Sequence, residues 1–193
     1  MKISHMKIFA CGICIFLSVT KVYAQVEFVP DSVINRMVIL ENATSVEKSL
    51  GDCMPLLDKN ADLPSVVFYN VSGTQYLKLI FHPGNPKNQF SYFEVGSTND
   101  KPQKNRKKPS KTSFQNFTTQ SGIRLGMSKR DLVSIKGFKY RQSLINKTQV
   151  IDYKIDNIKK SDFLRRYNMP EYTARYFFQK DILIKFSFGF EYP

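Results

Sequence analysis

The chain has 193 residues with a formal net charge of +13, and 42% of its residues are hydrophobic. This length supports one domain, or two small halves, with a buried core. Only 1 cysteine and 1 histidine lie beyond residue 24, which is too few for a zinc site or an internal disulfide framework in that part of the chain.

Residues 1–24 have the pattern of a secretory signal peptide. Two lysines supply the positive start, residues 8–19 form the apolar core, and small residues precede a cleavage site after Ala24. The apolar core is too short to span a membrane, and no other long apolar run follows it. Lipidation at Cys11 would require cleavage inside the apolar core. We therefore expect an exported protein with no transmembrane segment after cleavage.

Removal of residues 1–24 leaves Cys53 as the single cysteine and His82 as the single histidine. Three of the 29 basic residues are lost, so 26 remain against 16 acidic residues, a net charge of +10. We expect Cys53 to be a small buried residue; the alternative is an exposed thiol that dimerises the protein. No serine elbow accompanies His82, so a solvent-facing histidine is expected instead of a catalytic base.

The first predicted half, residues 25–97, combines a short helix with antiparallel strands. Its expected elements are an apolar-rich segment at 33–40, a helix at 45–50 that ends at Gly51, a hairpin of strands at 66–69 and 74–81, and a third strand at 90–95.

Residues 98–113 predict a basic polar linker or loop. No residue from Ser97 to Ser113 is apolar, so this segment cannot contribute to a core. We expect a solvated linker; the alternative is a patch that binds anionic polysaccharide or lipid head groups. Export argues against nucleic acid as a partner. The candidate polyanion-binding residues are Lys104, Arg106, Lys107, Lys108 and Lys111.

The second predicted half, residues 114–193, repeats the order of the first. Its expected elements are a helix at 128–136 that ends at Gly137, strands at 138–142 and 149–154, and a hairpin of strands at 172–178 and 182–192. In the last strand, strict alternation puts Ile182, Phe186 and Phe190 on one face and Leu183 on the other. We expect the aromatic face to pack in the core; a binding surface is the alternative.

Both halves together predict an α+β protein, with short helices packed on mainly antiparallel sheet. The two halves could be tandem helix-plus-sheet repeats, but the sequence identity between them is slight. Internal duplication is therefore kept as a hypothesis.

The stretch GIRLGMSKRDLVSIKG, residues 122–137, contains two glycines before a Ser-Lys pair. The spacing does not match a phosphate-binding loop or a dinucleotide fingerprint. Ser128 is instead a preferred N-cap residue, Asp131 lies three residues later, and Gly137 can end the helix. We interpret this stretch as a capped helix, with Ser128, Asp131 and Gly137 in structural roles.

This stretch, followed by aromatic strands, resembles the repeat unit of the β-lactamase-inhibitor-protein-like superfamily and the related SmpA/OmlA domains. The second half is also similar to uncharacterised exported proteins of Bacteroidetes. In the first half, residues 42–45 stand where the family has Gly-Met-Ser. The resemblance implies a duplicated helix-plus-sheet fold in the envelope of a Gram-negative bacterium, in the periplasm or at the cell surface. The matching residues are Gly126, Met127, Ser128, Asp131, Leu132, Ile135 and Gly137.

No residue set predicts a catalytic, cofactor-binding or metal site, and the resemblance implies no catalysis. Members of the superfamily inhibit enzymes or scaffold membrane complexes through the sheet surface. We therefore expect a non-enzymatic protein that binds a protein or another envelope component. The alternative is a protein that binds a polyanion through residues 101–111. A third hypothesis is an enzyme whose catalytic carboxylates are dispersed along the sequence.

Overall fold

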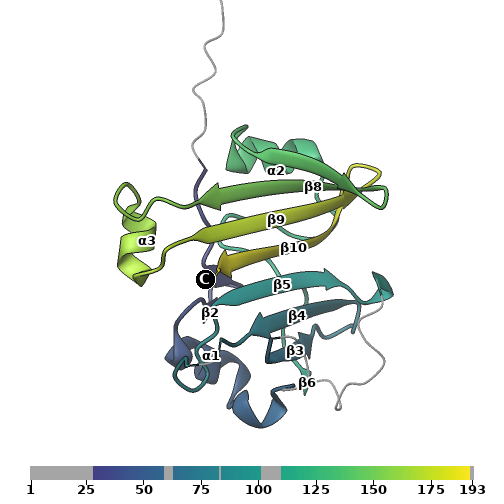
Figure 1. The fold of residues 1–193 in the computed structure, drawn as a ribbon. Helices are drawn as coiled ribbons and strands as arrows, with labels where there is room; N and C mark the ends of the chain where they lie inside the picture. The colour runs from purple at the N-terminus through teal and green to yellow at the C-terminus, as the bar shows by residue number, and fades with distance from the viewer. Residues whose placement is uncertain (1–27, 59–62, 83, 101–109, 192–193) are drawn as a thin grey trace, which may run out of the picture.

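The computed structural model describes residues 28–58, 63–82, 84–100 and 110–191 (Figure 1). The predicted signal segment lies outside these residues, and so does 101–109 of the basic segment. The helices are α1 (Ala43–Leu50), α2 (Lys129–Lys136) and α3 (Asp162–Tyr167), with short 3-10 turns η1 (Met54–Leu56) and η2 (Thr98–Asp100). The strands are β1 (Val33–Ile34), β2 (Val38–Ile39), β3 (Ser65–Tyr69), β4 (Gln75–Ile80), β5 (Tyr92–Ser97), β6 (Ser110–Lys111), β7 (Arg141–Ile145), β8 (Thr148–Ile155), β9 (Tyr172–Gln179) and β10 (Ile182–Phe190).

Eight strands form one continuous sheet in the order β6-β3-β4-β5-β10-β9-β8-β7. Every neighbouring pair is antiparallel except β3 and β6. The predicted α+β class with mainly antiparallel sheet is therefore confirmed. The order is mirrored about its centre, because β3-β4-β5 from the first half meets β10-β9-β8 from the second. Such an order is compatible with tandem repeats.

The predicted linker contributes to the sheet at its end. Ser110 and Lys111 form β6, which pairs in parallel with Phe68 and Tyr69 at the edge strand β3. Thr112 continues this contact, since its N–H donates to the carbonyl oxygen of Tyr69 at 2.8 Å. These residues of the basic segment therefore belong to the sheet edge.

The two halves join at the seam, which we define as the antiparallel pairing of β5 with β10. Gly189 has φ +153° at the seam, and a Cβ there would lie 2.2 Å from the carbonyl oxygen of Ser91. It would also lie 2.6 Å from the Cα of Tyr92. Glycine is required because only a residue without a Cβ allows the backbones to approach so closely.

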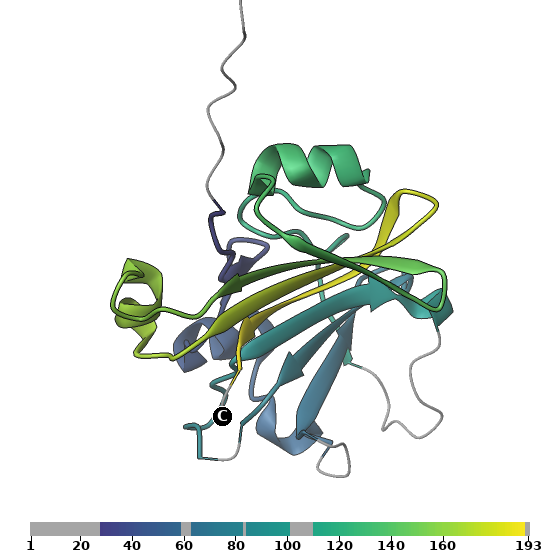
Figure 2. The same cartoon turned by 45° about the horizontal axis from the view of Figure 1, so that its top comes forward.

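One face of the sheet is buried beneath helices. Phe186, Phe188 and Phe190 of β10 are fully buried, as the alternating pattern predicts. The helices α1 and α2 and the β1–β2 hairpin lie on this side of the sheet (Figures 1 and 2), and Val46 and Leu132 pack into the same core. In the described part of the chain, no helix crosses the opposite face.

The helix α2 has side-chain and glycine caps at its two ends. The Oγ of Ser128 accepts from the N–H of Asp131 at 3.1 Å and donates to the Asp131 carboxylate at 2.8 Å. Gly137 follows the helix with φ +84°, and its N–H donates to the carbonyl oxygen of Val133. Local sequence alone therefore accounts for where α2 begins and ends.

Two details of the predicted strands are wrong. The strand expected at 138–142 begins at Arg141, because the chain first turns away after the helix and leaves Phe138 68% exposed. The strict alternation expected for β10 is broken by a register shift between Leu183 and Lys185. This bulge moves Leu183 into the core and leaves Ile182 exposed.

A buried ion pair ties α2 to the segment before β1. The Nζ of Lys136 lies 2.7 Å from Oδ2 of Asp31, and the two side chains are 1% and 0% exposed. Lys136 also donates to the carbonyl oxygen of Val29 at 2.7 Å, and Ser121 donates to Asp31 from its N–H and its hydroxyl. The charges are therefore satisfied inside the core, which such burial requires.

Candidate functional site

The open face is the side of the sheet opposite to the helices, formed by the side chains that alternate with the core residues. In β9, for example, Thr173, Arg175 and Phe177 lie on it while their strand neighbours are buried. From β4 to β8 the open face comprises Tyr76, Lys78, Ile80, Tyr92, Glu94, Lys185, Ser187, Thr173, Arg175, Phe177, Asp152 and Lys154.

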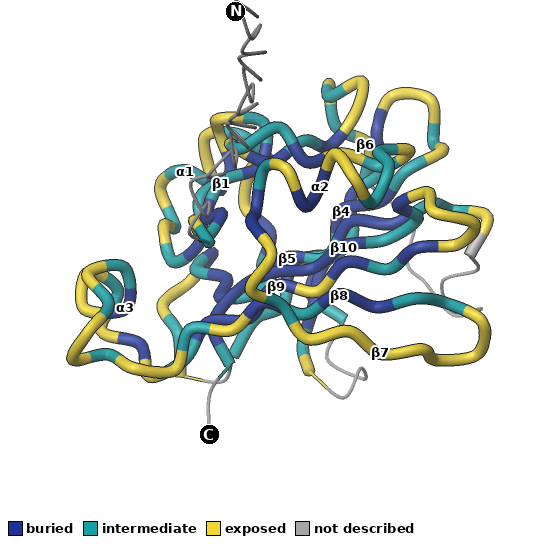
Figure 3. Tube along the Cα trace, turned by 90° about the horizontal axis from the view of Figure 1, so that it is seen from above, coloured by how far each residue is buried: buried dark blue, intermediate teal, exposed yellow. Residues whose placement is uncertain are grey.

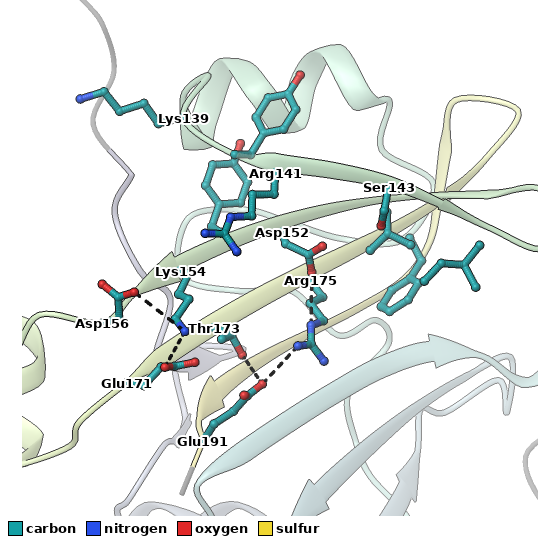
Figure 4. Close-up of a pocket in the computed structure, with 15 residues that line it drawn as sticks. Lys139, Arg141, Ser143, Asp152, Lys154, Asp156, Glu171, Thr173, Arg175 and Glu191 are labelled. Carbon is teal, nitrogen blue, oxygen red and sulfur yellow. Dashed lines mark hydrogen bonds and ion pairs between the residues drawn. The ribbon is translucent and has the colours of Figure 1, made fainter. Parts of the chain in front are cut away.

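Two adjoining hollows lie on the open face. The larger, of about 850 Å³, lies over β7, β8 and β9 (Figure 4), and the smaller, of about 520 Å³, lies over β4, β5, β9 and β10. Arg175, Phe177 and Glu191 line both hollows. The hollows therefore form one depression that crosses the seam, with Arg175 and Phe177 near its middle.

Paired charges line the larger hollow. The Nε of Arg175 lies 3.2 Å from Asp152, and its Nη2 lies 3.4 Å from Glu191 (Figure 4). Lys154 lies 2.7 Å from Glu171, and this hydrogen bond raises the pKa of Lys154 above its ordinary value. These side chains are part-exposed, so water screens the ion pairs and the charged groups can exchange partners at little cost.

Aromatic rings and hydroxyl groups line the smaller hollow. The Nζ of Lys185 lies 4.1 Å from the ring centroid of Phe177, a cation–π contact, and 3.9 Å from Glu94. The hydroxyl groups of Tyr92 and Ser187 lie 3.0 Å apart across the seam. Burial raises the pKa of Tyr92 above its ordinary value.

His82 lies at the border of the smaller hollow. It is partly buried, so its exposure is lower than that of a fully solvent-facing histidine. Burial lowers its pKa below the ordinary value, and Glu41 opposes that shift. No group of three or more histidine, cysteine, aspartate or glutamate side chains positioned to hold a metal ion occurs in the described ranges.

Cys53 is fully buried near the end of α1, so the alternative of an exposed, dimerising thiol is wrong. Its N–H donates to Oδ1 of Asn88 at 2.9 Å, which fixes the local backbone. Burial raises the pKa of the thiol to about 12. The thiolate, which is the reactive form of cysteine, is therefore strongly disfavoured.

Of the candidate polyanion-binding residues, the structure describes only Lys111. Lys104, Arg106, Lys107 and Lys108 lie outside the described residues. Lys111 is exposed in β6, at the opposite end of the sheet from β7 and β8. Within the ranges that the structure describes, no helix is long and apolar enough to cross a membrane.

Sequence reasoning did not identify the residues of the open face. The signal was present in β9, where the sequence YTARYFFQ alternates core aromatics with Thr173, Arg175 and Phe177. The residues that meet around Arg175 nevertheless come from β5, β8 and β10, and only the sheet order brings them together.

Comparison of the chain with protein-family models, curated proteins and solved structures gives no match.

Proposed function

We propose that this chain is an exported, non-enzymatic binding protein of the bacterial envelope that contacts a macromolecular partner with its open face, as an inhibitor or an assembly factor. The observation that carries this proposal is the depression across the seam, which lies on a sheet face that no described helix covers. The signal-peptide pattern and the family resemblance support the proposed location.

The chemistry of the depression supports a protein partner. Aromatic residues and arginine are enriched at the energetic centres of protein interfaces. Arg175 and Phe177 occupy such a central position here, between the two hollows. Asp152 and Glu191 already neutralise Arg175, so a partner that displaces water from this region would not leave an isolated buried charge.

The proposal is tested by capture from an envelope extract with the purified protein and two matched double variants. Arg175→Ala with Phe177→Ala removes the centre of the open face. Lys48→Ala with Lys159→Ala, at exposed positions on α1 and before α3, serves as the control. We expect a component captured by the unaltered protein and by the control to be lost with the first variant. Equal capture by both variants would overturn the proposal.

Polyanion binding through residues 101–111 is a second candidate because Lys104, Arg106, Lys107 and Lys108 fall within five positions. Replacement of these four residues by glutamine should then lower the salt concentration at which the protein elutes from heparin. Unchanged elution would remove this candidate. It would leave the open-face proposal intact, since that proposal rests on other residues.

A further inference from the structure

The strand β7 forms an open edge of the sheet. It pairs with β8 on one side only, and all five of its residues are exposed (Figure 3). At the other end of the sheet, the two-residue strand β6 covers part of the edge. An unpaired edge can accept a further strand, and proteins usually protect such edges.

The register of the β7–β8 hairpin shows which backbone groups are unpaired. Asn146 and Lys147 both have positive φ, 47° and 66°, and form a two-residue turn between Ile145 and Thr148. In such a hairpin the residue pair next to the turn, Ile145 and Thr148, exchanges two backbone hydrogen bonds. The following pair, Leu144 and Gln149, exchanges none, and the two kinds of pair alternate along the strands. The N–H and C=O groups of Gln142 and Leu144 consequently point away from β8, along the open edge.

The side chains of this edge are basic and aliphatic. Residues 139–147 contain Lys139, Arg141 and Lys147 and no acidic residue. A further cation comes from α2, since Lys129 donates to the side chain of Gln142 at 3.0 Å. Leu144 is 73% exposed at the same edge. A strand that pairs here would meet positive charge and an uncovered apolar side chain.

We propose that β7 binds an extended acidic peptide segment of a partner protein, which adds to the sheet as a further antiparallel strand. The unpaired groups of Gln142 and Leu144 supply the main-chain hydrogen bonds, and such bonds give strand addition its affinity. An acidic side chain beside Arg141 and an aliphatic one beside Leu144 supply the selectivity.

Charge complementarity favours this occupant over a second copy of the chain. The antiparallel register of two β7 strands that uses the outward groups of both Gln142 and Leu144 is centred on Ser143. That register brings the Lys139 segment before each strand beside the Lys147 turn of the other copy, and like charges brought close together are destabilising. An acidic segment gains from the same charges that repel a copy.

The edge site does not depend on the proposed open-face function. Arg141 and Ser143 also line the larger hollow, but Leu144 does not. A substitution at Leu144 therefore tests binding at the β7 edge without changing the hollow. The Arg175→Ala, Phe177→Ala variant tests binding at the open face without changing the β7 edge.

The probe is a ten-residue, end-capped peptide of alternating glutamate and valine, titrated into the purified protein and followed by fluorescence anisotropy. Leu144→Pro removes an outward N–H that does not bond to β8, a position where an edge strand tolerates proline. Leu144→Ala is the matched control, because it keeps the N–H. We expect the proline variant to weaken binding about tenfold or more, and the alanine variant by less than about threefold.

Amide hydrogen exchange gives a second readout that needs no variant. The peptide should slow exchange at Gln142 and Leu144 in the unaltered protein and leave Ser143, which already bonds to β8, unchanged. A matching lysine–valine peptide should not bind. The proposal is overturned if no peptide binds, if the lysine peptide binds equally well, if the two Leu144 variants bind alike, or if the free protein dimerises through β7.

Discussion

Replacement of Lys136 by methionine removes the cation of the buried ion pair and retains most of the volume of the side chain. In the native protein the Lys136 ammonium lies 2.7 Å from Asp31 and 2.7 Å from the carbonyl oxygen of Val29. The variant leaves the carboxylate of Asp31, which is 0% exposed, with only the two hydrogen bonds from Ser121. Both the ionic partner and one hydrogen bond are lost.

The expected cost is large compared with the stability of a domain. Removal of one member of a buried ion pair costs about 3–5 kcal/mol, whereas domains are stable by about 5–15 kcal/mol in total. We therefore expect Lys136→Met to lower the free energy of unfolding by about 3–5 kcal/mol. The double variant Lys136→Met, Asp31→Asn should lose clearly less than the sum of the two single variants, because it leaves no isolated charge in the core.

Urea unfolding followed by circular dichroism at pH 7 measures these differences. A pH series adds a second test, because burial lowers the pKa of Lys136 and Asp31 only partly opposes this shift. Between the lowered pKa and 10.5 the unfolded chain keeps a proton that the folded protein has released. In that pH window the contribution of Lys136 to the free energy of unfolding rises with pH. The Lys136→Met variant has no titrating group at this position and should not show this rise.

Two results would refute the reasoning about the ion pair. One is a loss below about 1 kcal/mol for Lys136→Met, which is the range of an exposed ion pair. The other is strict additivity in the double variant, which would show that the two side chains do not interact in the folded protein.

Further predictions concern three single positions. Ser128→Ala should lower the free energy of unfolding by about 1 kcal/mol through loss of the α2 cap, and an unchanged urea midpoint would contradict the capping role. Gly189→Ala should cost at least about 2 kcal/mol, because a Cβ would lie 2.2 Å from a backbone oxygen at the seam; full stability in thermal unfolding would contradict the close approach. Iodoacetamide at pH 8 should modify Cys53 at least about a hundredfold more slowly in the folded than in the unfolded protein, and equal rates would contradict its burial. Since the thiol pKa rises from 9.0 to about 12, the unfolded state loses this proton first, and the Cys53 contribution to stability should fall as pH increases from 9 to 12.

The local elements could be predicted because their signals lie within a few residues. Ser128 and Gly137 mark both ends of α2, and the aromatic alternation identifies the core face of β10. The bulge at Leu183 escaped prediction because an extra residue in one strand is visible only against the register of its partner.

The interactions between distant segments could not be predicted. Asp31 and Lys136 are both charged, and charged residues are usually placed at the surface, yet they meet in the core across 105 positions. The open face was missed for the same reason, because its residues are distant in the sequence and meet only in the folded sheet. Arg175 and Glu94 have ordinary surface character in the sequence, and only the mirrored strand order puts them on one depression.

The strand order also determines when folding can be completed. The strand at the centre of the sheet, β10, follows every other strand of that sheet along the chain. Until it is available, β5 and β9 have no shared neighbour, and the two halves cannot unite around one core. A ribosome delivers the strands in sequence order, so the sheet of the nascent chain stays incomplete until β10 has been synthesised. Such a delay suits the export that we propose, because an exported polypeptide is threaded through a membrane before it folds.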